Sequence, residues 1–247
     1  MNIRAWRAVT ALGALVLGLV GLVLVDFGAE SGAASVLFLV LMALPSYAAL
    51  IIWLGWRRGA VLLGVLTVLP LLVEAAAVAT GVPYGSFAYA DALGWKVFGL
   101  VPWTVGVAYP PVFLGAVTAA GILVGPTLRR FLPASALLLV AADLVLDPAA
   151  VSAGFWAWEN LGIYYGIPVV NFVGWAITGV FYAWVFHRGA GGSVPPPSMS
   201  SSAVLIFGFW TGYLLRESLL FPAFMGAALV ALFLLLPTGH PREGPEG

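Results

Sequence analysis

The chain has 247 residues, of which 62% are hydrophobic and only 8% are charged, and its mean hydropathy is +1.07. Soluble domains carry about 25% charged residues, so this composition excludes a soluble protein and indicates one that lies in a bilayer. The net charge is zero with no basic cluster, which argues against nucleic acid binding, and the lack of cysteine excludes disulfides and sulfur-ligated metals.

Seven apolar runs are long enough to cross a bilayer as helices. In chain order the runs are Ala8–Val25, Val36–Leu54, Ala60–Ala79, Val101–Val124, Pro133–Val151, Ile167–Phe186 and Ala203–Leu236. The first run also resembles a signal peptide, but further runs follow it and we expect a retained helix. The last run is interrupted by Arg216-Glu217 and suits two short helices with a tight turn. The sequence therefore predicts an all-α transmembrane bundle of seven or eight helices.

The composition also predicts how the chain is divided. We expect residues 1–188 to form a six-helix membrane core, 189–202 a flexible cytoplasmic linker rich in Gly, Pro and Ser, 203–236 a transmembrane hairpin, and 237–247 a polar tail. Eight arginines fall on the same side as the N-terminus, and Lys96 and Arg216 fall on the other. Basic residues favour the cytoplasmic side, so we expect a multi-pass cell-membrane protein with its N-terminus in the cytoplasm.

Carboxyl groups inside so apolar a chain are costly and mark functional positions. Asp143 and Asp147 lie four residues apart, so they share one face of a helix. Two such carboxyls away from water resist ionising together, and one of them can serve as a Brønsted acid. Pro148 frees a backbone carbonyl and marks a kink or a helix end, which leaves a capping role for Asp147 open. Glu74 is a single acid in the third run, either functional or engaged in an interhelical hydrogen bond.

Aromatic residues gather around the two acid-bearing runs, either as a membrane-interface belt or as the walls of a pocket. Aromatic faces also stabilise a carbocation. The candidates for substrate binding are Tyr84, Phe87, Tyr89, Trp156, Trp158, Tyr164 and Tyr165. Glu159 is either at the lip of the site or an ordinary interfacial acid, and Asn171 either bonds a carboxyl or water or packs helices together. His187 and His240 lie far from the acids in sequence, so we expect no metal.

Two segments of the core resemble each other. Phe87 to Pro102 and Phe155 to Pro168 both read as aromatics, an acid, Leu-Gly, Gly, an apolar residue and Pro. Glu74 lies 19 residues before Leu93, and Asp143 lies 18 residues before Leu161. This similarity predicts a parallel two-helix repeat with sites that face each other, unless it is a coincidence of two Gly/Pro-rich loops.

A long motif supports a family resemblance over about residues 70–186. It runs Asp147-Pro148, Gly154-Phe155-Trp156-Ala157-Trp158, Gly162-Ile163-Tyr164-Tyr165-Gly166-Ile167-Pro168 and Asn171-Phe172-Val173-Gly174-Trp175. With Gly81-Val82-Pro83-Tyr84-Gly85-Ser86-Phe87-Ala88-Tyr89 and Leu93-Gly94, it resembles the signatures of the integral-membrane carotenoid biosynthesis family. Gly99-Leu100-Val101-Pro102 departs from the pattern by one extra residue.

The characterised members of that family are CruF-type carotenoid 1′,2′-hydratases. The resemblance implies that water is added across the terminal C1′–C2′ double bond of an acyclic C40 or C50 carotenoid, to give a tertiary hydroxyl without a cofactor or metal. The partners would be the membrane-dissolved carotenoid, water, the lipid bilayer and other carotenoid biosynthesis enzymes.

We assign the roles from the residues. Asp143 or Asp147 would donate the proton, and Glu74 would orient water, with Glu159 or Asn171 as further groups that guide it. Three alternatives stay open. A cyclase would use the same protonation, a proton-coupled transporter would use Glu74 and Asp143 as a relay, and a membrane scaffold would use neither.

Overall fold

The structure is a computed structural model, and it describes residues 3–24 and 32–237. Its α-helices are α1 (Ile3–Val23), α2 (Gly32–Leu54), α3 (Trp56–Thr80), α4 (Thr104–Val124), α5 (Leu128–Ser152), α6 (Val169–Gly189), α7 (Ser201–Arg216) and α8 (Leu220–Leu235). Within the described ranges, seven helical segments are long and apolar enough to cross a membrane, and α8 is a shorter apolar helix. The predicted all-α polytopic bundle is confirmed. The predicted polar tail after Pro237 lies outside the described residues.

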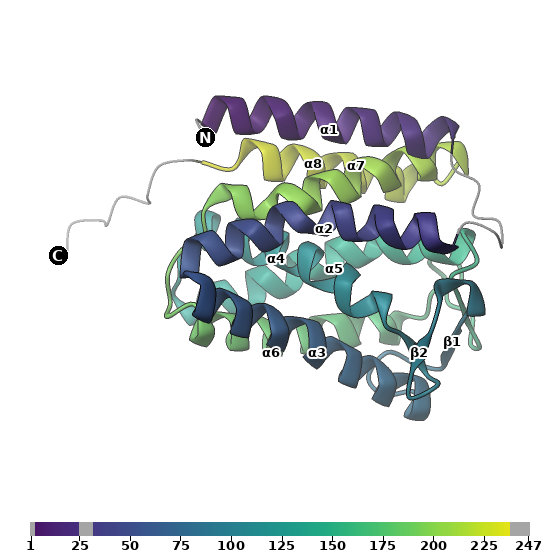
Figure 1. Ribbon diagram of the computed structural model, residues 1–247. Coiled ribbons are helices and arrows are strands. Elements are labelled where there is room, and N and C mark those ends of the chain that lie inside the picture. The colour runs from purple at the N-terminus through teal and green to yellow at the C-terminus, as the bar shows by residue number, and fades with distance from the viewer. Residues whose placement is uncertain (1–2, 25–31, 238–247) are drawn as a thin grey trace.

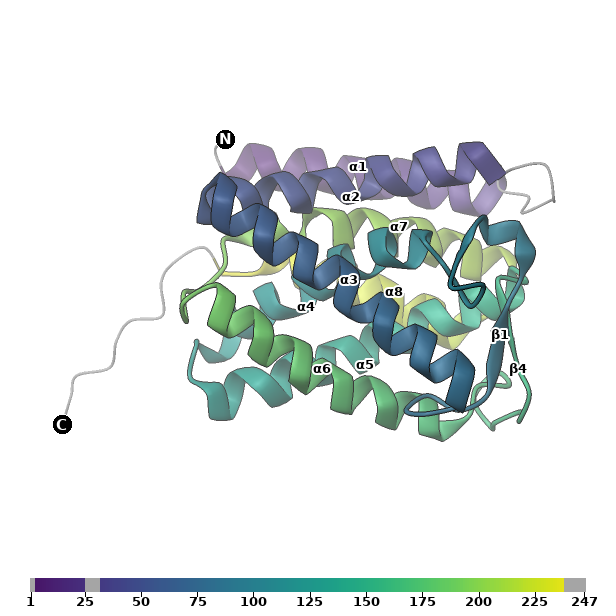
Figure 2. The same cartoon turned by 60° about the horizontal axis from the view of Figure 1, so that its bottom comes forward.

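The helices run up and down, so the connections alternate between two ends of the bundle (Figure 1). One end carries all the short strands of the described chain, β1 (Phe87–Tyr89), β2 (Lys96–Val97), β3 (Val101–Pro102) and β4 (Trp156–Trp158), and the 3-10 helix η1 (Asp91–Leu93). Strands β1 and β4 lie side by side at this end (Figure 2) and pair antiparallel, with Ala88 opposite Ala157. The two segments that resemble each other in sequence are therefore in direct contact.

Helix α4 forms the centre of the bundle and contacts α2, α3, α5, α7 and α8. Small residues allow this close packing. A Cβ at Gly106 would collide with Leu71, and one at Gly115 would collide with Ala203. Because nearly every residue from Tyr109 to Ile122 is buried, α4 offers its neighbours a rigid wall.

Helix α1 packs lengthwise on α7 through glycines. Gly18 and Gly212 approach so closely that a Cβ at Gly212 would overlap the Gly18 backbone. On the other side of α1, Leu12, Leu15 and Leu19 are more than half exposed. Exposed leucines at helical spacing are typical of a surface that faces lipid.

Prolines inside two helices free backbone carbonyls, and tyrosine hydroxyls bind them. Pro148 cannot donate to the Leu144 carbonyl, which instead accepts from Tyr164 Oη at 2.7 Å. Pro111 likewise cannot donate to the Val107 carbonyl, which accepts from Tyr47 Oη at 2.7 Å. Helix α5 therefore continues past Pro148 to Ser152, so the helix does not end at the proline.

The segment predicted as a flexible linker is partly built into the bundle. Its second half contains the 3-10 helix η2 (Pro197–Ser200), where Met199 and Ser200 are fully buried. Ser202 and Ser46 exchange hydrogen bonds, each backbone N–H donating to the other hydroxyl at 2.9 and 3.0 Å. The physical reason is that buried serine hydroxyls can satisfy backbone groups, so a serine-rich segment need not face water.

Candidate active site

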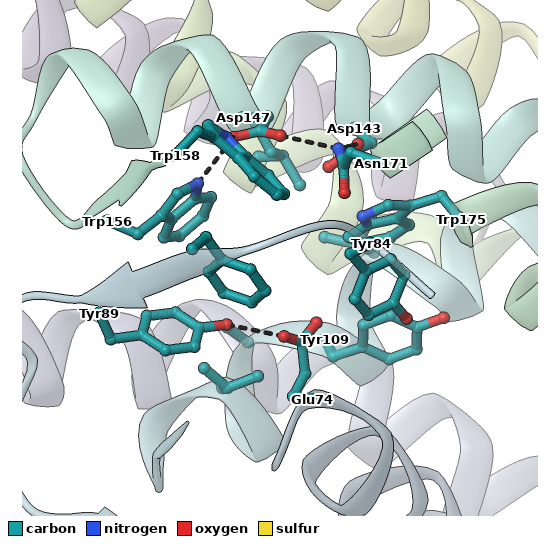
Figure 3. Close-up of a pocket in the computed structure, with 15 residues that line it drawn as sticks. Glu74, Tyr84, Tyr89, Tyr109, Asp143, Asp147, Trp156, Trp158, Asn171 and Trp175 are labelled. Carbon is teal, nitrogen blue, oxygen red and sulfur yellow. Dashed lines mark hydrogen bonds between the residues drawn. The ribbon is translucent and has the colours of Figure 1, made fainter. Parts of the chain in front are cut away.

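A pocket of about 130 Å³ lies at the strand-bearing end of the bundle (Figure 3). Its lining residues are Glu74, Tyr84, Phe87, Tyr89, Val105, Ala108, Tyr109, Val112, Asp143, Leu146, Asp147, Trp156, Trp158, Asn171 and Trp175. They come from α3, α4, α5, α6 and both loop segments. Sites for drug-sized ligands are about 300–1,000 Å³, so this pocket has room for a small group or one end of a long molecule.

One wall carries the aspartate pair. Asn171 Nδ2 donates to Asp143 Oδ2 at 2.6 Å and to Asp147 Oδ2 at 2.8 Å, so a single amide joins both carboxyls. The indoles of Trp156 and Trp158 donate to Asp147 Oδ1 at 2.7 and 3.2 Å. Both reach the same oxygen because alternate residues of a strand point to one face. Asp147 thus receives three N–H donors, and Asp143 receives one.

The opposite wall carries Glu74, which accepts a hydrogen bond from Tyr89 Oη at 3.1 Å (Figure 3). Burial raises the pKa of the Tyr89 hydroxyl well above its usual value, and the neighbouring Glu74 raises it further. Tyr89 therefore keeps its proton and acts as a donor to the carboxyl. The site has acids on two facing helices, α3 and α5.

The paired strands cover the space between the acids with aromatic rings. Phe87 packs on Trp158 with ring centroids 4.9 Å apart, and Tyr89 packs edge-to-face on Trp156 at 5.7 Å. We call these four residues the aromatic sheet. Since Trp158 and Phe87 are more than nine-tenths buried, the aromatic sheet shields the acids from water.

The charge of the site is unusual for a buried pocket. Glu74, Asp143 and Asp147 are 7%, 2% and 1% exposed, and no Lys, Arg or His lines the pocket. Buried carboxylates normally need a cation or several donors to stay ionised. Together the three carboxyls accept five hydrogen bonds from four residues, and three of these bonds go to Asp147. Asp143 and Glu74 accept one each, so the site favours an undissociated acid at one of its carboxyls.

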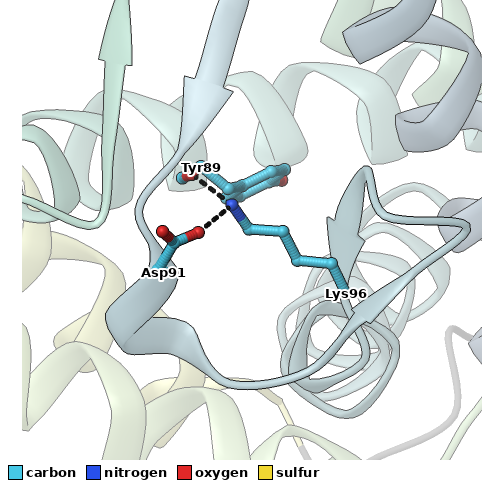
Figure 4. Close-up of polar contacts among 3 residues, drawn as sticks. All are labelled: Tyr89, Asp91 and Lys96. Atoms are coloured by element: carbon cyan, nitrogen blue, oxygen red, sulfur yellow. Dashed lines mark hydrogen bonds and ion pairs between the residues drawn. The ribbon is translucent and has the colours of Figure 1, made fainter.

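A lysine fixes the loop behind β1 (Figure 4). Lys96 Nζ donates to the Tyr89 carbonyl at 2.8 Å and to Asp91 Oδ1 at 2.7 Å. The hydrogen bond and the charge of Lys96 lower the pKa of the fully exposed Asp91. Lys96 thus holds the strand that presents Tyr89 to Glu74.

Nine of the twelve candidate site residues line the pocket: Glu74, Tyr84, Phe87, Tyr89, Asp143, Asp147, Trp156, Trp158 and Asn171. The structure does not bring the other three there. Glu159 is exposed and follows β4 on the outside of the aromatic sheet. Tyr164 binds the Leu144 carbonyl instead, and Tyr165 is 41% exposed. Alternate residues of a strand point to opposite faces, and Trp156 and Trp158 face the pocket, so the next residue, Glu159, points away from it.

The twelve candidate site residues include none from α4. Val105, Ala108, Tyr109 and Val112 line the pocket with the spacing i, i+3, i+4 and i+7, which is one face of a helix. Asn171 and Trp175 on α6 are related by four residues in the same way. Helical spacing relates these residues, but α4 is apolar on every side, so the sequence does not indicate which face of the helix lines the pocket.

The fold and the pocket define a polytopic membrane protein with a buried, acid-containing and aromatic-lined site. Comparison with known proteins gives its family. The sequence model of the family described as carotenoid biosynthesis protein matches residues 30–233, so the chain belongs to this family. The resemblance inferred from the motifs is confirmed.

A curated relative is the bisanhydrobacterioruberin hydratase of Haloarcula japonica. It is 36% identical to this chain over 138 residues, which is 54% of this chain and 46% of the relative. The matched region thus spans less than half of the relative's length. No solved structure matches the chain.

Proposed function

We propose that this protein is a carotenoid hydratase, which adds water across the terminal C1′–C2′ double bond of an acyclic carotenoid to give a tertiary hydroxyl. The observation that carries the proposal is the pocket, in which three buried carboxyls face aromatic rings without any basic residue. The name of the Haloarcula japonica relative points to the same reaction class.

Asp143 is the proposed proton donor. A carboxylate that accepts several N–H bonds is stabilised in its ionised form. Asp147 accepts three such bonds and Asp143 accepts one, so Asp147 is the better candidate for the charged member of the pair. Asp143 then keeps its proton, with Oδ1 left for the alkene, and proton transfer to carbon generates the tertiary cation.

The aromatic sheet suits the cation that this transfer creates. Ring faces attract a cation by roughly 0.5–2 kcal/mol each, and Trp156 and Trp158 lie next to the aspartate pair. The negative charge on Asp147 would also stabilise the cation at short range.

Water completes the reaction. Its oxygen bonds to the cation carbon, and its proton passes to Glu74 as the base on the opposite wall. The net change is one water added to the double bond, while Asp143 has lost a proton and Glu74 has gained one. The cycle closes when the proton returns through solvent or the pocket.

The membrane arrangement fits a hydrocarbon substrate. The described arginines Arg4, Arg7, Arg57, Arg58, Arg129, Arg130 and Arg188 lie near helix ends opposite the strands. By the positive-inside rule, that end faces the cytoplasm, as does the N-terminus, and the pocket lies in the outer half of the cell membrane. A C40 or C50 carotenoid dissolved in the bilayer could then reach it.

Two variants test the assignment in a host that accumulates an acyclic carotenoid. Asp143→Asn and Glu74→Gln should each lower hydrated product by about 10²–10⁴-fold, because each removes one proton-transfer group. Glu217→Gln removes an acid at the same end of the bundle but outside the pocket, and should behave as wild type. Near-normal hydration by both pocket variants would contradict the assignment.

The mass of the product separates hydration from its alternatives. Hydration adds the mass of one water to the carotenoid, whereas cyclisation by the same cation leaves the mass unchanged. A wild-type product of unchanged mass with new rings would favour a cyclase.

A further inference from the structure

A polar cluster at the edge of the pocket has no part in the proton transfers described so far. Tyr109 is 6% exposed and lines the pocket, yet its hydroxyl has no hydrogen-bond partner among the described residues. Tyr182 is fully buried, and its hydroxyl also lacks a hydrogen bond of ordinary geometry within the described chain. A buried hydroxyl without a partner is costly, and phenylalanine would fill either position without that cost.

The two hydroxyls belong to one group. The rings of Tyr109 and Tyr182 pack edge-to-face with centroids 5.4 Å apart. The rings of Tyr84 and Tyr109 both pack on Trp175, with centroids 6.3 and 5.6 Å from it (Figure 3). The Tyr84 hydroxyl donates to Thr178 Oγ1 at 3.2 Å. Thr178 Oγ1 donates onward to the Gly174 carbonyl at 2.9 Å. We call Tyr84, Tyr109 and Tyr182 the tyrosine cluster.

The tyrosine cluster has the properties of a water site. A buried water needs two to four polar partners, and three phenolic oxygens that can each still accept or donate supply them. The other α4 residues of the pocket, Val105, Ala108 and Val112, are apolar and offer no competing partner. Tyr109 opens onto the same cavity as Glu74 and Asp143.

From this geometry we infer that the tyrosine cluster binds the water that hydration consumes, with Tyr109 as the positioning residue at the pocket. The inference rests on the proposed function. The hydroxyls hold the water and do not react. The water oxygen forms the new carbon–oxygen bond, and its proton goes to Glu74. Asp143 donates the other proton to carbon independently of the cluster.

An assay in D₂O separates water capture from protonation. Protonation that is followed by proton loss puts deuterium into recovered substrate, whereas water capture gives the hydrated product. Tyr109→Phe should lower hydrated product by about tenfold or more, because the water is no longer held in line with the cation. Deuterium in the recovered substrate should not fall, since Asp143 is intact. Tyr182→Phe should act in the same direction.

Two control variants are compared with Tyr109→Phe. Asp143→Asn should lower both deuterium incorporation and hydration. Tyr213→Phe removes the hydroxyl of another buried tyrosine, on α7 outside the pocket, and should leave the ratio of hydration to deuterium incorporation unchanged. The inference is overturned if Tyr109→Phe lowers both quantities together or changes neither.

A measurement without turnover keeps this inference separate from the proposed function. An experimental density map of the wild-type protein should contain a water within hydrogen-bond distance of Tyr109 Oη, and the Tyr109→Phe map should lack it. Wild-type protein that neither hydrates nor labels any acyclic carotenoid would defeat the proposed function and the role of the water in it, whereas a water at Tyr109 Oη would still establish the site itself. A wild-type map without that water would defeat the water site.

Discussion

Asp143 and Asp147 are the same residue type on the same helix face, but their surroundings differ. Three N–H groups from Trp156, Trp158 and Asn171 converge on Asp147, whereas only Asn171 reaches Asp143. Residues 9 to 28 positions away along the chain set this difference. The sequence therefore identifies the pair but leaves open which member would donate the proton.

Lys96 and Asp91 form an ion pair whose two members should differ in importance. Lys96 also holds the Tyr89 carbonyl, whereas Asp91 is fully exposed. We expect Lys96→Met to lower hydration several-fold by loosening the strand that positions Tyr89, and Asp91→Asn to change it by less than about twofold. Hydrated product from isolated membranes measures both, and equal losses would contradict this division.

The ion pair between Lys96 and Asp91 also predicts how the stability of the fold changes with pH. Lys96 lowers the pKa of Asp91 in the folded protein. The stabilisation by this pair is therefore fully present above the ordinary carboxyl pKa and is lost as the pH falls through the lowered value. Wild type and Asp91→Asn should converge in thermal stability only in that acidic range.

At the scale of helices and strands, α5 depends on a side chain outside itself. Tyr164→Phe would leave the Leu144 carbonyl without its donor, next to Asp143, and should lower the free energy of unfolding by about 1–3 kcal/mol. Tyr165→Phe removes the neighbouring hydroxyl, on a ring that is 41% exposed, and should have little effect. Thermal unfolding in detergent compares the two, and equal midpoints would show that the carbonyl finds another donor.

The sequence predicted the helices well and the strands not at all. Apolar runs such as Val36–Leu54 and Pro133–Val151 lie within α2 and α5, because hydropathy alone decides what can cross a bilayer. Strands β1 and β4 have three residues each, and they form because they pair with each other although α4 and α5 separate them along the chain. No local pattern of that length can specify such a contact, although the similarity of the two segments pointed to it.

The site was predicted in the same uneven way. Placing a carboxyl group inside a membrane costs free energy, so few acids are tolerated in such a chain. This criterion selected Glu74 and Asp143, and both line the pocket. Glu159 met the same criterion of an acid among aromatics, but the alternation of β4 directs Trp156 and Trp158 inward and leaves Glu159 exposed. Tyr109 sits in an apolar run, where composition gives no indication of which face meets the site.

At the scale of the whole molecule, α1 is joined to the bundle by glycine contacts that do not line the pocket. Gly212→Ala would force α7 away from Gly18 and should destabilise the fold by about 1–3 kcal/mol. Gly64→Ala on α3 meets nothing within 4 Å and should be neutral or stabilising by up to about 1 kcal/mol. Thermal unfolding tests both, and hydration per folded molecule should be the same in each variant.

The arrangement of the bundle explains why the site is rigid. Helix α4 contacts five other helices and supplies one face of the pocket, and α3, α5 and α6 supply the facing polar groups. Both strand-bearing loops close over this space from one end. The geometry of the pocket depends on six separated segments and is held by the packing of the whole molecule.

The small volume of the cavity has a consequence for how a symmetrical polyene would be processed. Some 130 Å³ admits one terminus, while the remainder of the molecule stays among the acyl chains. Under the proposed function, the protein recognises one end of the carotenoid and not its overall length. A carotenoid with two identical ends would have to dissociate and rebind in the opposite orientation before its second end could react. Singly hydrated intermediates would therefore accumulate before doubly hydrated products.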